Sequence, residues 1–138
     1  MIKSIDVIEI EQPIGTFYLG KMSSTDVLKI SNVKRRFEKE NGIQRELSFS
    51  RVKEIAAYCN DPDATFPTPI ILSVNSSDTE KIISNGILQF QFDDKKIFAE
   101  ILDGQHRVYG IKENSQMELD LVIILSSNHI YHKYHILS

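Results

Sequence analysis

The stretch Ala99-Glu100-Ile101-Leu102-Asp103-Gly104-Gln105-His106-Arg107-Val108-Tyr109-Gly110-Ile111 joins an apolar strand to a helix through a polar turn. The strand ends near Leu102, and we expect the helix to run from about Gln105 to Glu113. Gly104 permits the tight turn between them. Because the free backbone N–H groups at a helix start carry partial positive charge, this turn predicts a phosphate-binding site.

Two side chains of the turn can add to that site. Arg107 carries a planar fork of donors suited to bidentate phosphate binding, and His106 lies beside it. A structural interpretation stays open, because Asp-Gly is common in strand-to-helix turns and a His-Arg pair can bond a neighbouring carboxylate. Spacing alone does not decide between the two interpretations.

Length and composition indicate one ordinary domain. The chain has 138 residues, of which 41% are hydrophobic and 25% are charged. The net charge of −3 provides no general attraction to nucleic acid. Binding of DNA would therefore have to depend on a local basic patch.

Cysteine usage and hydropathy indicate a cytoplasmic protein. The single cysteine, Cys59, cannot form an intramolecular disulfide, and its place on an apolar helical stripe indicates a core residue. We expect no signal peptide, and no apolar run approaches membrane-spanning length. These features predict a soluble protein that makes no membrane contact.

The hydrophobic pattern predicts an α+β domain over residues 1–126 and a tail over 127–138. The expected strands cover residues 4–12, 15–21, 70–74, 87–92, 96–102 and 119–125. We expect 87–92 and 96–102 to form a hairpin, and 75–78 to form a loop. Two other helices are expected. One starts after the capping residues 23–26 and continues to Glu40. The other starts at Ser48 or Ser50 and has an apolar stripe that includes Cys59.

The string from Asp103 to Arg107 matches in full the DGQHR motif that names the DGQHR-domain family. Residues 42–47, 51–58 and 66–72 are similar to that family's first half in content and order. The resemblance covers roughly residues 5–125. The family resembles a branch of the ParB/sulfiredoxin superfamily and includes DndB-type proteins associated with DNA phosphorothioate modification.

This resemblance implies a ParB/sulfiredoxin-like mixed sheet with helices packed around it. It also implies that Gly104, Gln105, His106 and Arg107 hold nucleotide phosphates or form part of a DNA-handling surface. Gln105 stands where sulfiredoxins carry their reactive cysteine, so a sulfiredoxin-type thiol reaction is excluded at this position. Family members commonly continue past the last strand, which implies a shortened version here.

Further candidates lie outside the motif. The resemblance suggests that Arg45 or Arg51, with Gln44 nearby, folds back toward Arg107, whereas the structural interpretation makes these residues surface or capping groups. Glu100 and Asp103 could supply carboxylates to Mg²⁺ or activate water, although a Glu on a half-exposed strand is usually solvated.

Two charged stretches complete the candidates. The basic residues Lys34, Arg35, Arg36 and Lys39 could face an anionic partner or only solvent. His129, His132 and His135 recur at a spacing of three, but this stretch lacks a carboxylate partner and we expect a poorly packed tail. We therefore assign no metal site there.

Two functions follow from these observations. The first is a DNA-associated, nucleotide- or phosphate-binding regulator or accessory protein of a DNA modification or phage-defence system. The second is a magnesium-dependent NTP hydrolase or ParB-like nuclease that uses Asp103 and His106 as catalytic groups in the same pocket. Both imply DNA or ATP (or another NTP with Mg²⁺) as ligands, and protein partners from the same system. A protein-interaction fragment with a purely structural motif remains the third alternative.

Overall fold

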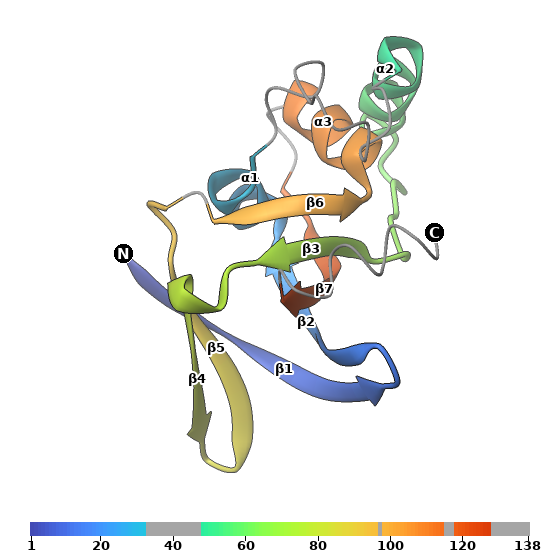
Figure 1. Cartoon of the computed structure of the whole chain (residues 1–138). Helices are drawn as coiled ribbons and strands as arrows, with labels where there is room; N and C mark the ends of the chain where they lie inside the picture. The colour runs from blue at the N-terminus through green and yellow to red at the C-terminus, as the bar shows by residue number, and fades with distance from the viewer. Residues whose placement is uncertain (33–47, 97, 115–117, 128–138) are drawn as a thin grey trace.

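The computed structural model describes residues 1–32, 48–96, 98–114 and 118–127 (Figure 1). Within these residues, seven strands, three α-helices and one 3-10 turn follow one another as β1 (Ile2–Gln12), β2 (Gly15–Ser23), α1 (Ser24–Ile30), α2 (Phe49–Tyr58), β3 (Ile70–Val74), η2 (Ser76–Asp78), β4 (Thr79–Ser84), β5 (Ile87–Asp93), β6 (Ala99–Asp103), α3 (Gln105–Glu113) and β7 (Asp120–Ser127). They form one small domain, and the predicted α+β class is confirmed.

All seven strands belong to one mixed sheet in the order β4-β5-β1-β2-β7-β3-β6. Neighbouring strands are antiparallel except β3 and β7, which run parallel. Figure 1 shows that the sheet twists strongly between its two ends. The β4–β5 hairpin projects from one end, whereas the three helices gather near β6 at the other.

The core lies where α1 and α3 meet the strands β3, β6 and β7. Val27 and Ile30 of α1 are fully buried, and Val108 of α3 is almost so. They belong to one apolar cluster with Leu72 of β3 and Ile123 of β7, which are also fully buried. This cluster fixes where β6 ends and α3 begins, because both elements contribute to it.

Helix α2 packs on α3, and the two helices run in the same direction. At their amino ends, the Ser48 N–H donates to Nε2 of His106 at 3.0 Å. At their carboxyl ends, Asn114 Nδ2 donates to the Ala56 carbonyl at 3.3 Å. Between these bonds Gly110 allows close approach, because a Cβ there would lie 2.6 Å from Cβ of Ile55.

The first helix is shorter than predicted. Helix α1 ends at Ile30, and Ser31 is extended with φ −100° and ψ 146°. Ser31 forms a parallel bridge with Ala99, and the Asn32 N–H donates to the Ala99 carbonyl at 3.0 Å. The prediction that the helix continues to Glu40 is therefore wrong, because pairing with β6 replaces the next helical turn.

The predicted hairpin between residues 87–92 and 96–102 is also wrong. Strand β5 pairs with β4 and β1, whereas β6 pairs with β3 at the opposite edge of the sheet. The hairpin partner of β5 is β4, which the prediction omitted. Their two-residue turn is Asn85-Gly86, with φ of 53° and 79°, as a type I′ hairpin requires.

Other predictions agree closely with the structure. The first hairpin, the strand over residues 70–74 and the helix over 105–113 are confirmed, as is Ser48 as the cap of α2. Cys59 is buried at the end of α2, and burial raises the pKa of its thiol. It is thus a core residue, as the helical stripe indicated.

Replacing Gly110 with Ala tests the close packing of the two helices. Gly→Ala in a helix interior normally stabilises by about 1 kcal/mol. Here the new methyl group would push Ile55 away, so we expect the free energy of unfolding to fall by about 1–3 kcal/mol in urea denaturation. An increase in stability would contradict the close contact.

Candidate functional site

The candidate site lies where β6 passes into α3. Between Leu72 and Ile71 the β3–β6 register shifts, and Ile101 and Leu102 are both buried. A bulge of this kind re-aims the following residue, and Asp103 is exposed. The strand therefore delivers an exposed carboxylate immediately before the helix.

Gly104 makes the turn that starts α3. Its φ of 103° lies in the left-handed region, and a Cβ there would approach the Ile70 Cδ1 atom to 2.5 Å. The first helical hydrogen bond runs from the Val108 N–H to the Gly104 carbonyl at 3.0 Å. The N–H groups of Gln105, His106 and Arg107 precede this bond and have no acceptor within the helix backbone.

Gln105 and Arg107 use their side chains to hold neighbouring backbone. Gln105 is buried, and its Nε2 lies 3.4 and 3.5 Å from the carbonyl oxygens of Ile101 and Leu102. Arg107 Nη1 donates to the carbonyl of Thr68 and, at 2.7 Å, to its hydroxyl, while Nη2 donates to the Pro69 carbonyl at 3.0 Å. Arg107 thus ties the segment before β3 to the start of α3.

These three bonds use part of the guanidinium, which has five N–H donors. Burial lowers the pKa of Arg107, Asp103 opposes that shift, and the positive charge of Arg51 adds to it. The group stays charged at any physiological pH. Sequence analysis expected Arg107 to bind phosphate or a neighbouring carboxylate and missed Thr68 and Pro69, because nothing in their sequence marks carbonyls that need a donor.

His106 connects the site to α2. Its Nε2 accepts the Ser48 N–H at 3.0 Å. Ser48 is itself the N-cap of α2, because its Oγ accepts the Arg51 N–H at 3.3 Å. The N-cap residue of α2 is therefore bonded through its backbone N–H to a side chain in the first turn of α3.

The parallel packing brings the amino ends of α2 and α3 side by side. In these two described helices, no Asp or Glu lies in the first turn. Arg51 of α2 is exposed, and its positive charge contributes to the lowering of the Arg107 pKa. Its predicted part in a polyanion site stays a prediction. Two helix amino ends and two guanidinium groups are thus found at this end of the domain, together with the carboxylate of Asp103.

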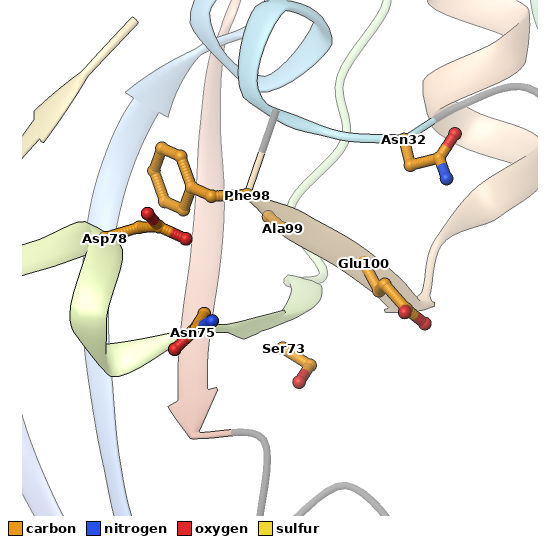
Figure 2. A pocket seen from close by; sticks show the side chains of 7 residues that line it. All are labelled: Asn32, Ser73, Asn75, Asp78, Phe98, Ala99 and Glu100. Atoms are coloured by element: carbon orange, nitrogen blue, oxygen red, sulfur yellow. The ribbon is translucent and has the colours of Figure 1, made fainter. Parts of the chain in front are cut away.

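Glu100 lies three residues before Asp103, at the other end of β6. It lines a separate pocket whose other lining side chains are mostly polar (Figure 2). Three residues of strand span about 10 Å. Within the described residues, no three His, Cys, Asp or Glu side chains gather where they could hold a metal ion.

Several candidates fall outside the described residues. They are Gln44 and Arg45, the basic residues Lys34, Arg35, Arg36 and Lys39, and the histidines His129, His132 and His135. Their predicted roles stay predictions. Among the described residues, no helix is long and apolar enough to cross a membrane.

Comparison with known families gives the context of this site. The family model named DndB, described as DNA-sulfur modification-associated, matches residues 5–124, which include the entire turn at Gly104. The chain belongs to the DndB family. No curated protein and no solved structure matches it. The site described above therefore lies within the DNA-sulfur modification-associated domain of a DndB family member.

Replacing Arg107 with Lys keeps the charge but removes the planar fork that reaches Thr68 and Pro69. We expect the free energy of unfolding to fall by about 1–2 kcal/mol, because backbone acceptors lose a charged donor. Urea denaturation measures this. Arg51→Lys is the matched control and should change stability by less than about 0.5 kcal/mol, since Arg51 is exposed. Equal stability of the two variants would mean that the Arg107 bonds contribute nothing.

Proposed function

We propose that this DndB family member is a phosphate-binding regulator or accessory protein of a DNA-sulfur modification or defence system. The observation that carries the proposal is the adjacency of two helix amino ends, those of α2 and α3, with Arg51 and Arg107 beside them. Oriented N–H groups and guanidinium groups are the donors that bind phosphate best. Family membership supports DNA as the source of that phosphate.

Each residue of the site has a different role in the proposed binding of phosphate. Gly104 makes the turn that starts α3, packed against Ile70 and the Arg107 guanidinium, and the exposed Arg51 neutralises the charge of the phosphate in this proposal. Arg107 adds positive charge from a fixed position, since Thr68 and Pro69 hold it. His106 keeps the two helix ends together through Ser48, which makes it a positioning residue in this proposal.

The exposed position of Arg51 favours the phosphate backbone of DNA over a deeply enclosed nucleotide. DNA binding by a chain with a net charge of −3 has to depend on such a local basic patch. Such binding should be strongly salt-dependent, because each neutralised phosphate releases condensed counterions. We infer that the surface binds the backbone without reading base sequence by itself.

Substitution of Arg51 tests the proposal directly. Arg51→Gln should weaken binding of a fluorescent DNA duplex about tenfold at low salt, since one charge-assisted phosphate contact is lost. The slope of log affinity against log salt should also become shallower by about one unit. The readout is fluorescence anisotropy over a series of salt concentrations.

The matched control is Lys53→Gln, which removes an equal charge from an exposed position on the same helix. It should leave binding within about twofold of wild type, because residues two apart on a helix do not share a face. Equal weakening by both variants would overturn a specific site in favour of general charge.

A nucleotide is the second source of phosphate in this proposal. Calorimetric titration with ATP, CTP and GTP, with and without Mg²⁺, tests it. Selective binding that Arg51→Gln weakens would identify a nucleotide site, and Asp103 would then be the exposed carboxylate nearest to Mg²⁺. Binding of DNA without any nucleotide would restrict the site to the DNA backbone.

A further inference from the structure

Strand β4 is an edge of the sheet, and among the described residues no strand pairs with its outer side. It lies at one end of the strand order and pairs only with β5. Figure 1 shows the β4–β5 hairpin projecting from the domain, away from the three helices. An open edge presents a row of backbone N–H and C=O groups that can pair with another strand. Neither the family description nor the proposed phosphate site accounts for this edge.

The turn of the hairpin decides which backbone groups of β4 face outward. Ser84 and Ile87 flank the two-residue turn, so this pair exchanges the hydrogen bonds that close the hairpin. Because bonding alternates along an antiparallel pair, the N–H and C=O groups of Ile82 also point toward β5. The same groups of Lys81 and Ile83 point to the open edge. Each of these two residues therefore offers one donor and one acceptor to a further strand.

The edge lacks most of the features that keep exposed strands apart. Prolines, bulges and exposed lysines usually protect an edge from pairing. Strand β4 contains no proline, and its register with β5 is unbroken from Thr79 to Ser84. Its lysine, Lys81, donates to the Tyr18 hydroxyl at 3.1 Å and lies 5.3 Å from the centre of that ring. The ammonium group is thus held over its own sheet, and Ile83 stays 76% exposed at the edge.

The sequence of β4 suits antiparallel pairing with a second copy of itself. A two-fold axis perpendicular to a sheet keeps each face on its own side, so opposed residues must belong to the same face. An axis at Ile82 opposes the two Ile82 residues, and it opposes Lys81 of each copy to Ile83 of the other. Glu80 then lies opposite Ser84, so no like charges meet. An axis at Lys81 would oppose two lysines, which is destabilising.

We propose that β4 pairs antiparallel with β4 of a second copy, so that two seven-stranded sheets continue as one across a two-fold axis at Ile82. Each Lys81–Ile83 pair exchanges backbone hydrogen bonds, and the Ile83 side chain covers the alkyl stem of the opposing Lys81. Strand β6 and the amino end of α3 lie at the opposite end of the strand order. The proposal is therefore independent of phosphate binding at that end.

Sedimentation equilibrium of the whole chain tests the association. The wild type should form a reversible dimer between about 10 µM and about 1 mM protein, as expected for a weak contact between two short strands. Ile83→Lys should weaken the dimer at least about tenfold, because the new charge opposes Lys81 of the other copy. A wild type that stays monomeric over this range would overturn the proposal.

Ile8→Lys is the matched control for Ile83→Lys. Ile8 is also exposed, at 64%, but it belongs to β1, which lies between β5 and β2 and has no open edge. This variant should leave the dissociation constant within about twofold of wild type, since an exposed site outside the contact contributes little. Equal weakening by the two variants would indicate general hydrophobic association and overturn the paired edge.

Amide hydrogen exchange locates the contact on the chain. The Lys81 and Ile83 N–H groups should exchange at least about tenfold more slowly as the concentration is raised through the association range, because pairing gives them acceptors. The Ile82 N–H points toward β5 in the monomer already and should change less. Dimer formation without slower exchange at Lys81 and Ile83 would place the contact elsewhere and overturn the proposal.

A cysteine at position 82 tests the register. The two opposed Ile82 Cα atoms should lie about 4.5 Å apart, within the range of a disulfide. Ile82→Cys should therefore form a covalent dimer under mild oxidation at least about tenfold faster than Glu80→Cys, whose partner is Ser84. The unchanged chain, whose one thiol is the buried Cys59, gives the background. Equal rates for the two variants would overturn the axis at Ile82.

Discussion

The parallel packing of α2 on α3 is the constraint on which the candidate site depends. Antiparallel helices would place the amino end of one beside the carboxyl end of the other. Here both amino ends lie together, so their partial positive charges add. Gly110 permits the close contact, and hydrogen bonds at the Ser48 and Asn114 ends fix the direction. The charge of Arg51 therefore reaches the motif from a helix that lies about fifty residues earlier in the chain.

Arg107 shows that one side chain can serve both the fold and the site. Its bonds to Thr68 and Pro69 hold the entry to β3, which a proline-rich segment cannot do with its own N–H groups. The same bonds hold the guanidinium in place, so in the proposed function little further side-chain entropy would be lost on binding an anion. In a flexible side chain, the bonds to the backbone and the proposed anion contact would compete. In a side chain held in place by the backbone, the two roles are compatible.

Local signals in the sequence predicted local structure well, and failed where a distant partner decided the outcome. The helix over 105–113 and the strand over 70–74 follow from short-range periodicity and from the glycine turn. The first helix stops at Ser31 because Ala99 pairs with it, and that partner is 68 residues away (99 − 31). The missed strand β4 had a local signal in Asn85-Gly86, which the neighbouring Asp93-Asp94-Lys95 turn obscured. For the site, the residues of the motif were predictable, but the carbonyl partners of Arg107 were not.

The turn at Gly104 and the pocket lined by Glu100 lie at the two ends of one strand pair. Strand β6 begins at the pocket of Asp78 and Glu100 and ends at Gly104, and β3 runs the opposite way beside it. The first and last of the five residues of β6 lie about 13 Å apart, beyond the Debye length of about 8 Å at physiological salt. Exposed charges at one end are therefore largely screened from the other end. Thr68 and Pro69 precede β3 at the Arg107 end and Asn75 follows it at the pocket, so a single short strand connects the two regions, and the Arg107 bonds fix where that strand begins.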